Sequence, residues 1–89
     1  MNFEFDKNKS SANLLKHGID FRQAQKLWAD EFLLRIKAVT AKENRYLFIG
    51  QIAEKCYTAI ATYRGENVRI ISVRRARKKE EEFYEKNKV

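Results

Sequence analysis

Four segments in which apolar and polar residues alternate, separated by short polar stretches, constrain the fold of this chain more than any other feature. The segments cover residues 32–38, 46–51, 56–63 and 68–73, and the connections cover 40–44, 53–55 and 64–67. A two-residue period places successive side chains on opposite faces of a β-strand. Short connections join antiparallel neighbours, and Gly65 supplies the positive φ that tight hairpin turns favour. The pattern predicts a four-stranded antiparallel meander.

Two helices are predicted before the first of these strands. Asp6 suits the N-cap of a helix over residues 7–16, because its carboxylate accepts hydrogen bonds from the free N–H groups of the first turn. Gly18 suits the left-handed position just after that helix. The apolar residues available for burial on it are Ala12, Leu14 and Leu15. Ahead of it, residues 3–6 alternate apolar and acidic side chains, as in a short edge strand or an extended arm.

The second helix is predicted to begin at Asp20. Gln23 stands three residues later, which is the spacing of a capping box. The apolar face that would pack on the sheet consists of Phe21, Ala24, Leu27 and Trp28.

The end of the chain changes from a strand to a helix within residues 67–79. Strict alternation puts Val68, Ile70 and Ser72 on one face of the strand and Arg69, Ile71 and Val73 on the other. On this basis Arg69 and Arg74 do not share a face, although Arg74 lies where the strand ends. The helix is predicted to run to about residue 87 and to pack through Ala76, Phe83 and Tyr84.

This last segment is also the most basic part of the chain. Six cations lie between Arg69 and Lys79 without an acid among them, and five crowd the expected start of the helix. A helix N-terminus favours Asp or Glu instead, by about 0.3–1 kcal/mol each. Residues 80–82 are all Glu, but they follow one turn later. We therefore expect the cations to serve an anionic partner, above all a phosphate backbone.

Together these elements predict an α+β fold in a single domain over residues 1–89. It has a small antiparallel four-stranded sheet, two N-terminal helices and one C-terminal helix. The helices are expected on one face, and the more polar opposite face is the expected binding surface.

Composition narrows the class of protein. The net charge of +7 favours nucleic acid, an anionic membrane surface or an acidic protein as partner. The single cysteine, Cys56, forms no internal disulfide, which suits a reducing cytoplasm. The first residues lack the pattern of a signal peptide, and no apolar run is long enough to cross a membrane. A cytoplasmic protein is expected.

The residues predict neither a metal nor another cofactor. One histidine and one cysteine do not supply the usual zinc ligands, and the three isolated glycines form no phosphate-binding loop. If the anionic partner is RNA, cleaving it requires neither, because the RNA's own 2′-hydroxyl attacks the adjacent phosphorus. Fixed Arg and Lys groups stabilise the developing charge. A positioned acid or base adds about 10²–10⁴-fold.

Two motifs together resemble the BrnT toxin family. They comprise residues 3–6 with Lys9, Asn13, residues 16–19, Phe21 and Ala24, and then Arg64, Gly65, residues 69–76, Glu81 and Tyr84. The resemblance extends over residues 3–84. It implies a toxin of a type II toxin–antitoxin pair with a fold similar to RelE-type ribonucleases. It also implies a BrnA-like antitoxin that carries a ribbon-helix-helix DNA-binding module.

Eight residues are the candidates for the site. The expected catalytic residues are Arg64, Arg74, Lys16 and His17, and the expected RNA-binding residues are Arg69, Arg75, Arg77 and Lys9. His17 is the single histidine, the residue type most often used as a general acid or base. Alternatively, Lys16 and His17 only contact the last carbonyls of the first helix, and the arginines form a solvated basic surface.

Other conspicuous residues have structural interpretations. Cys56, Trp28 and Tyr84 are expected in the core. Tyr57 and Tyr63 share a strand face and either stack on a base or pack under a helix.

Three functions are consistent with these patterns. The first is a ribonuclease toxin that cuts mRNA, stops translation and is neutralised by its antitoxin. The second is a non-catalytic nucleic-acid-binding module or co-repressor. The third is an interaction domain for an acidic protein, which predicts no RNA affinity even at low salt.

Overall fold

The computed structural model describes residues 1–38 and 44–88. It confirms an α+β fold, with three α-helices, one 3₁₀-helix (η1) and a five-stranded sheet in the order β1-β5-β4-β3-β2. Most of the connection predicted at 40–44 lies outside the described residues. The elements are β1 (Asn2–Glu4), α1 (Lys7–His17), α2 (Phe21–Ala24), η1 (Gln25–Ala29), β2 (Leu34–Ala38), β3 (Arg45–Ile52), β4 (Lys55–Arg64), β5 (Asn67–Arg75) and α3 (Lys78–Asn87). None of the described helices is both long and apolar enough to cross a membrane.

The prediction of a four-stranded antiparallel sheet is wrong by one strand. Strands β2 to β5 form the expected antiparallel meander. The N-terminal segment adds a short edge strand, β1, which pairs parallel to β5 with Glu4 opposite Arg69. The sheet is therefore mixed, because β1 enters it beside the last strand and not beside the next one along the chain.

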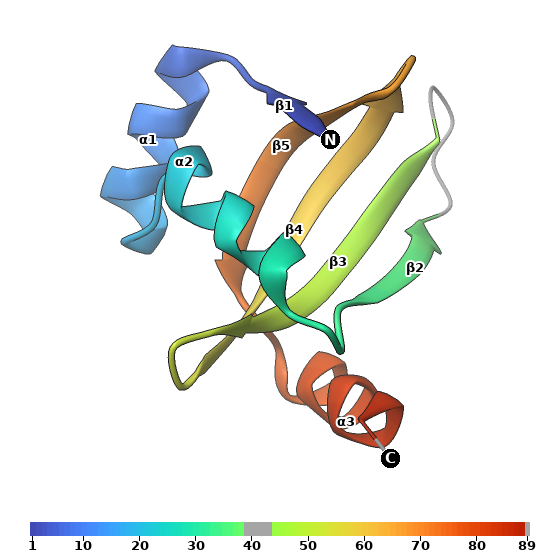
Figure 1. Cartoon of the computed structure of the whole chain (residues 1–89). Helices are drawn as coiled ribbons and strands as arrows, with labels where there is room; N and C mark the ends of the chain where they lie inside the picture. The colour runs from blue at the N-terminus through green and yellow to red at the C-terminus, as the bar shows by residue number, and fades with distance from the viewer. Residues whose placement is uncertain (39–43, 89) are drawn as a thin grey trace.

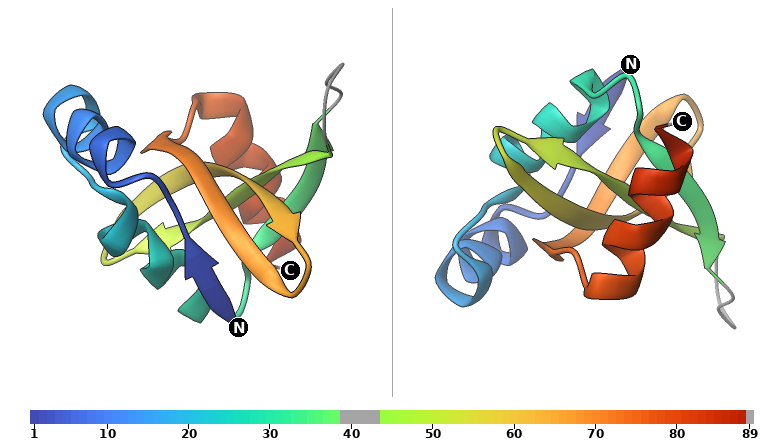
Figure 2. Two further views of the ribbon diagram at one scale, coloured as in Figure 1. Left: turned by 90° about the horizontal axis from the view of Figure 1, so that it is seen from above. Right: turned by 90° about the horizontal axis from the view of Figure 1, so that it is seen from below.

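The helices cover both faces of the sheet, so the prediction of a single helical face is also wrong (Figures 1 and 2). On β3, Gly50 lies beneath Leu27 of η1. The neighbouring Ile49 points to the opposite face and clusters with Tyr84 of α3. We call these the α2 face and the α3 face.

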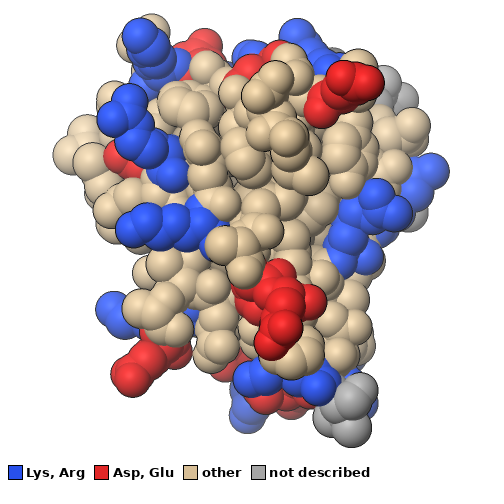
Figure 3. Space-filling model, in the orientation of Figure 1, with Lys and Arg blue, Asp and Glu red and all other residues tan. Residues whose placement is uncertain are grey.

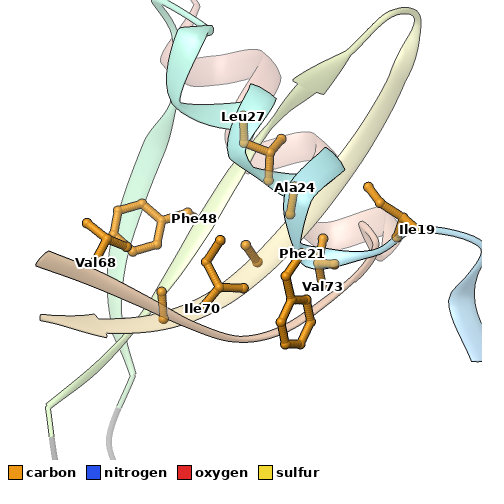
Figure 4. Close-up of a cluster of buried hydrophobic side chains, with 10 residues drawn as sticks. Ile19, Phe21, Ala24, Leu27, Phe48, Val68, Ile70 and Val73 are labelled. Carbon is orange, nitrogen blue, oxygen red and sulfur yellow. The ribbon is translucent and has the colours of Figure 1, made fainter. Parts of the chain in front are cut away.

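The main core lies on the α2 face of the sheet, beneath α2 and η1 (Figure 4). The predicted apolar side of the second helix is confirmed, because Phe21, Ala24 and Leu27 are fully buried. That helix begins with one α-helical turn, α2, and continues as the 3₁₀-helix η1. The predicted Asp20–Gln23 capping box caps its start. The buried residues of this core are Ile19, Phe21, Ala24, Leu27, Phe48, Ala59, Ala61, Val68, Ile70 and Val73.

A β-bulge in β5 changes the predicted faces of this strand. Ile70 pairs with Ala61 and Ser72 pairs with Ile60, so Ile71 is an extra residue in the ladder. Val73 consequently joins Val68 and Ile70 on the α2 face. The alternation predicted from sequence is wrong beyond the bulge, because one inserted residue reverses every later side chain.

The same bulge brings two of the candidate arginines together on one face. Arg69 pairs with Thr62 and Arg74 pairs with Thr58, and the two threonines lie on the same face of β4. Both arginines therefore lie on the α3 face, which strict alternation had excluded.

Helix α1 is capped as predicted but packs through different residues. Asp6 accepts hydrogen bonds from the N–H groups of Asn8 and Lys9, and Gly18 ends the helix in the left-handed conformation. Its buried residues are polar, Ser10 and Asn13. The prediction that its apolar residues are buried is wrong: Ala12, Leu14 and Leu15 are all exposed.

Asn13 explains why a polar residue faces inward on α1. Its Nδ2 group donates to the carbonyl of Val73 at 2.8 Å and to that of Ile19 at 2.7 Å. Its Oδ1 atom accepts from the N–H of Val73 at 3.3 Å. Strand β1 stops opposite Arg69, so the outer edge of β5 has no neighbouring strand beyond that point. The side-chain amide takes the place of a peptide group there, because buried backbone groups need hydrogen-bond partners.

Helix α3 packs through Tyr84, which is 1% exposed, as predicted. The prediction that Phe83 packs beside it is wrong, because Phe83 is 43% exposed. Ala76 precedes the helix but does pack against the Tyr84 cluster. The Tyr84 hydroxyl donates to Asp30, which also accepts from the N–H groups of Phe32 and Gln51. Burial and this hydrogen bond raise the pKa of Tyr84, so the hydroxyl stays protonated and joins α3 to η1 and β3.

We predict that Asn13→Asp destabilises the fold by about 2–4 kcal/mol, because it removes both amide donors and buries a charge beside two carbonyls. Chemical denaturation at pH 7 measures this loss. Asn8→Asp, at an exposed position in the first turn of the same helix, is the matched control and should leave stability nearly unchanged. Equal stability of the two variants would contradict the role assigned to Asn13.

Candidate nucleic-acid interface

The eight candidate residues fall into two groups. Lys9, Arg64 and Arg69 lie near β1 and the start of α1, and we call them the N-terminal corner. The other five lie where β5 and α1 end, and we call them the β5 exit; they are Lys16, His17, Arg74, Arg75 and Arg77. Figure 3 shows Lys and Arg gathered on the flank of the molecule where α1 lies.

In the N-terminal corner, two arginines share one carboxylate. The Arg69 guanidinium lies 3.4 Å from Glu4, and Arg64 Nε lies 4.0 Å from it. Asn67 donates a third contact at 3.1 Å. These groups, led by the Asn67 hydrogen bond, hold the pKa of Glu4 below its ordinary value. Asp6 lies within electrostatic range of Lys9 and Arg69, so three cations face two carboxylates and the corner keeps one excess positive charge.

At the β5 exit, Arg74 forms a bidentate ion pair with Glu80. The two N–O distances are 2.7 and 2.9 Å, and both side chains are less than one-fifth exposed. Glu80 also accepts from the Thr58 hydroxyl at 2.9 Å and from the N–H of Arg77 at 2.8 Å. These hydrogen bonds, led by Arg74, lower the pKa of Glu80 to about 2. The guanidinium is rigidly held and largely neutralised.

This arrangement corrects the interpretation of the charge order at the last helix. The helix begins at Lys78, later than the cation cluster suggested, so Arg74 and Arg75 belong to the strand. Glu80 then stands in the first turn, where its carboxylate satisfies a free N–H group and suits the helix dipole. The acids are therefore not misplaced, and only Lys78 and Lys79 oppose the dipole.

Beside Arg74, two arginines of the exit and two lysines at the start of α3 are exposed. Arg75 lies over the ring of Tyr57, 5.6 Å from its centroid, on the α2 face. Arg77, Lys78 and Lys79 are exposed at the start of α3. Within residues 1–38 and 44–88, none of these four forms an ion pair. They are available to an anionic partner.

Lys16 and His17 complete the exit from the side of α1. Helix α1 packs on β5, and the two elements run in the same direction in Figure 1, so both C-terminal ends lie on one side of the molecule. The helix end is closed by the Gly18 N–H, which donates to the carbonyl of Leu14. Among the described hydrogen bonds, none links Lys16 or His17 to the last carbonyls, so the capping alternative is not the geometry observed.

Cys56 and Trp28 pack in the interior as predicted, whereas Tyr63 lies at the surface. Cys56 is buried, and burial raises the pKa of its thiol to about 11, which keeps it protonated and unreactive. Trp28 packs between the rings of Phe3 and Phe48. Tyr63 is partly exposed and lies beside Arg35, whose guanidinium donates to its hydroxyl at 3.1 Å.

Several residues at these sites were missed from the sequence. Glu80 of α3 contacts both Arg74 and Thr58 of β4. Thr58 is far from Glu80 in the sequence, so no local spacing predicts that contact. Arg35 lies within 5.2 Å of the Tyr46 ring centroid. That contact follows from the β2–β3–β4 register, which alternation alone does not determine.

Comparison with known protein families identifies the family of this chain. A family model described as the ribonuclease toxin, BrnT, of a type II toxin–antitoxin system matches residues 5–80. The chain belongs to the BrnT family. The match confirms the resemblance seen in the two sequence motifs, and a type II system implies an antitoxin partner for this BrnT protein. No curated protein matches the chain. Within the described residues, no three His, Cys, Asp or Glu side chains gather to hold a metal ion.

We predict that Glu80→Gln destabilises this BrnT protein by about 2 kcal/mol at pH 7, because it removes the charge that pairs with Arg74. The pKa of Glu80 is lowered, so its contribution is complete above the ordinary value of 4.5 and disappears as the pH falls toward 2. Denaturation between pH 7 and pH 2 should show the gap between wild type and variant closing. Glu82→Gln, at an exposed position of the same helix, should show no gap at any pH.

Proposed function

We propose that this protein is a metal-independent endoribonuclease that inhibits translation and uses the β5 exit as its site. The observation that carries the proposal is the gathering of exposed cations and the single histidine at the ends of β5 and α1, in a chain of the BrnT family. A surface of this kind attracts an RNA backbone without any base-specific contact.

The chemistry at this site relies on the substrate's 2′-hydroxyl as nucleophile. His17 is the proposed general acid or base, because an imidazole exchanges protons near neutral pH. Lys16 and Arg74 are proposed to stabilise the charge that develops on the phosphoryl oxygens. Glu80 holds the Arg74 guanidinium in one orientation before the substrate binds. The strongly lowered pKa of Glu80 makes this carboxylate a poor base.

The remaining candidates are proposed to bind the RNA backbone. Arg75 and Arg77 contact phosphates next to the cleaved one. Lys9, Arg64 and Arg69 continue the positive surface toward the N-terminal corner. We further propose a RelE-type fold, a cytoplasmic location, and an antitoxin of the ribbon-helix-helix class.

Purified protein with single-stranded RNA and EDTA tests the proposal, with translating ribosomes supplied in a parallel reaction. We expect cleavage in EDTA, and a loss of about 100-fold for His17→Ala. The double variant Arg75→Ala, Arg77→Ala should bind RNA more weakly at every sequence, with a shallower dependence of affinity on salt. Circular dichroism establishes that the variants remain folded, and Lys26→Ala, an exposed cation on η1, is the control.

A second candidate function is a non-catalytic nucleic-acid-binding or co-repressor module. The ion pair between Arg74 and Glu80 favours it, because the guanidinium proposed for catalysis is already engaged while exposed cations around it can still bind a phosphate backbone. RNA binding without cleavage, with or without ribosomes, would support this candidate over the first. Cleavage that appears only when Mg²⁺ replaces EDTA would support ribonuclease activity but contradict the proposal that it is independent of metal.

A further inference from the structure

The edge of the sheet opposite β1 has three features that the ribonuclease site does not use. Strand β2 is the last strand of the sheet, so its outer backbone groups face no neighbour among the described strands (Figure 1). A groove of about 510 Å³ lies between β2 and α3. Its lining is mostly apolar and consists of Leu34, Ile36, Phe83, Lys86 and Asn87.

Two large aromatic residues near this groove are exposed. Phe83 is 43% exposed and Phe32 is 37% exposed. Phe32 directly precedes the strand, and its carbonyl accepts a hydrogen bond from Asn87 at the end of α3. An open strand edge has unpaired backbone groups, and an exposed apolar groove beside it can bury side chains, so together they can bind a strand of another chain.

The opposite side of the same strand is basic. Arg35 and Lys37 are exposed and alternate with Leu34 and Ile36, so they point to the α2 face. A positive cluster appears on this flank in Figure 3. The strand therefore presents an apolar side and a cationic side to any segment that pairs with it.

We propose that this edge docks an extended segment of the antitoxin, which adds a strand beside β2. The segment alternates apolar residues, which enter the groove against Phe83, with acidic residues, which face Arg35 and Lys37. Backbone hydrogen bonds supply affinity in this mode, and the alternating side chains supply specificity. The charge complementarity also suits a partner for a chain of net charge +7. The inference rests on the antitoxin that the family implies and not on RNA cleavage.

Calorimetric titration of the full chain with its cognate antitoxin tests the docking site. Phe83→Asp and Lys37→Glu should each weaken binding by about tenfold. The matched controls make the same changes elsewhere: Leu15→Asp on α1 and Lys26→Glu on η1 should stay within about twofold of wild type. Hydrogen exchange should show new protection in the complex of those amides among residues 34–38 that point away from β3.

Three outcomes would overturn the proposal. They are unchanged affinity in both Phe83→Asp and Lys37→Glu, a larger loss in Leu15→Asp than in Phe83→Asp, and no new protection of the outward-facing β2 amides in the complex. Sedimentation of the free protein separates a second copy from the antitoxin: a dimer dispersed by Phe83→Asp, with antitoxin affinity unchanged, assigns the groove to self-association and also overturns it. RNA cleavage by the same variants should remain at the wild-type level, so this result stands apart from the ribonuclease test.

Discussion

The hydrogen bonds between the Asn13 amide and Val73 are the contacts on which the arrangement of this molecule depends. One buried side chain satisfies both backbone groups of a strand residue and also holds the carbonyl of Ile19, where the chain turns toward α2. A short β1 leaves most of the β5 edge without a strand, and α1 covers that edge through polar contacts. Because this contact positions α1, it also positions Lys16 and His17 relative to the end of β5.

The bulge at Ile71 is the second determinant of the site. It allows β5 to keep Val68, Ile70 and Val73 in the core while Arg69 and Arg74 share the opposite face, one near each end of the strand. The positive surface is thus built on β5, whose backbone pairs with β4 along its length and with β1 only as far as Arg69. Carboxylates from β1 and α3 then orient the two guanidinium groups, so the cations are fixed at the cost of some of their charge.

Much of the fold was predictable, because its signals are local. The caps at Asp6 and Asp20, the left-handed Gly18 and the meander each follow from residue type and spacing. The failures concern contacts between distant segments. Alternation does not reveal a bulge, and an apolar pair such as Leu14 and Leu15 suggests burial unless the polar partner of Asn13 is known. Likewise, the candidate cations were predictable as residues, but the division into two groups and the neutralisation of Arg74 required the positions of β1 and α3.

The Glu80 carboxylate has a further consequence for how the protein behaves. It closes the first turn of α3 and at the same time holds the guanidinium of Arg74 at the end of β5. The conformation of the C-terminal helix and the charge displayed by the sheet are therefore linked. Any event that unwinds the start of α3 would unmask a cation, and any anion that captured Arg74 would loosen the helix in return.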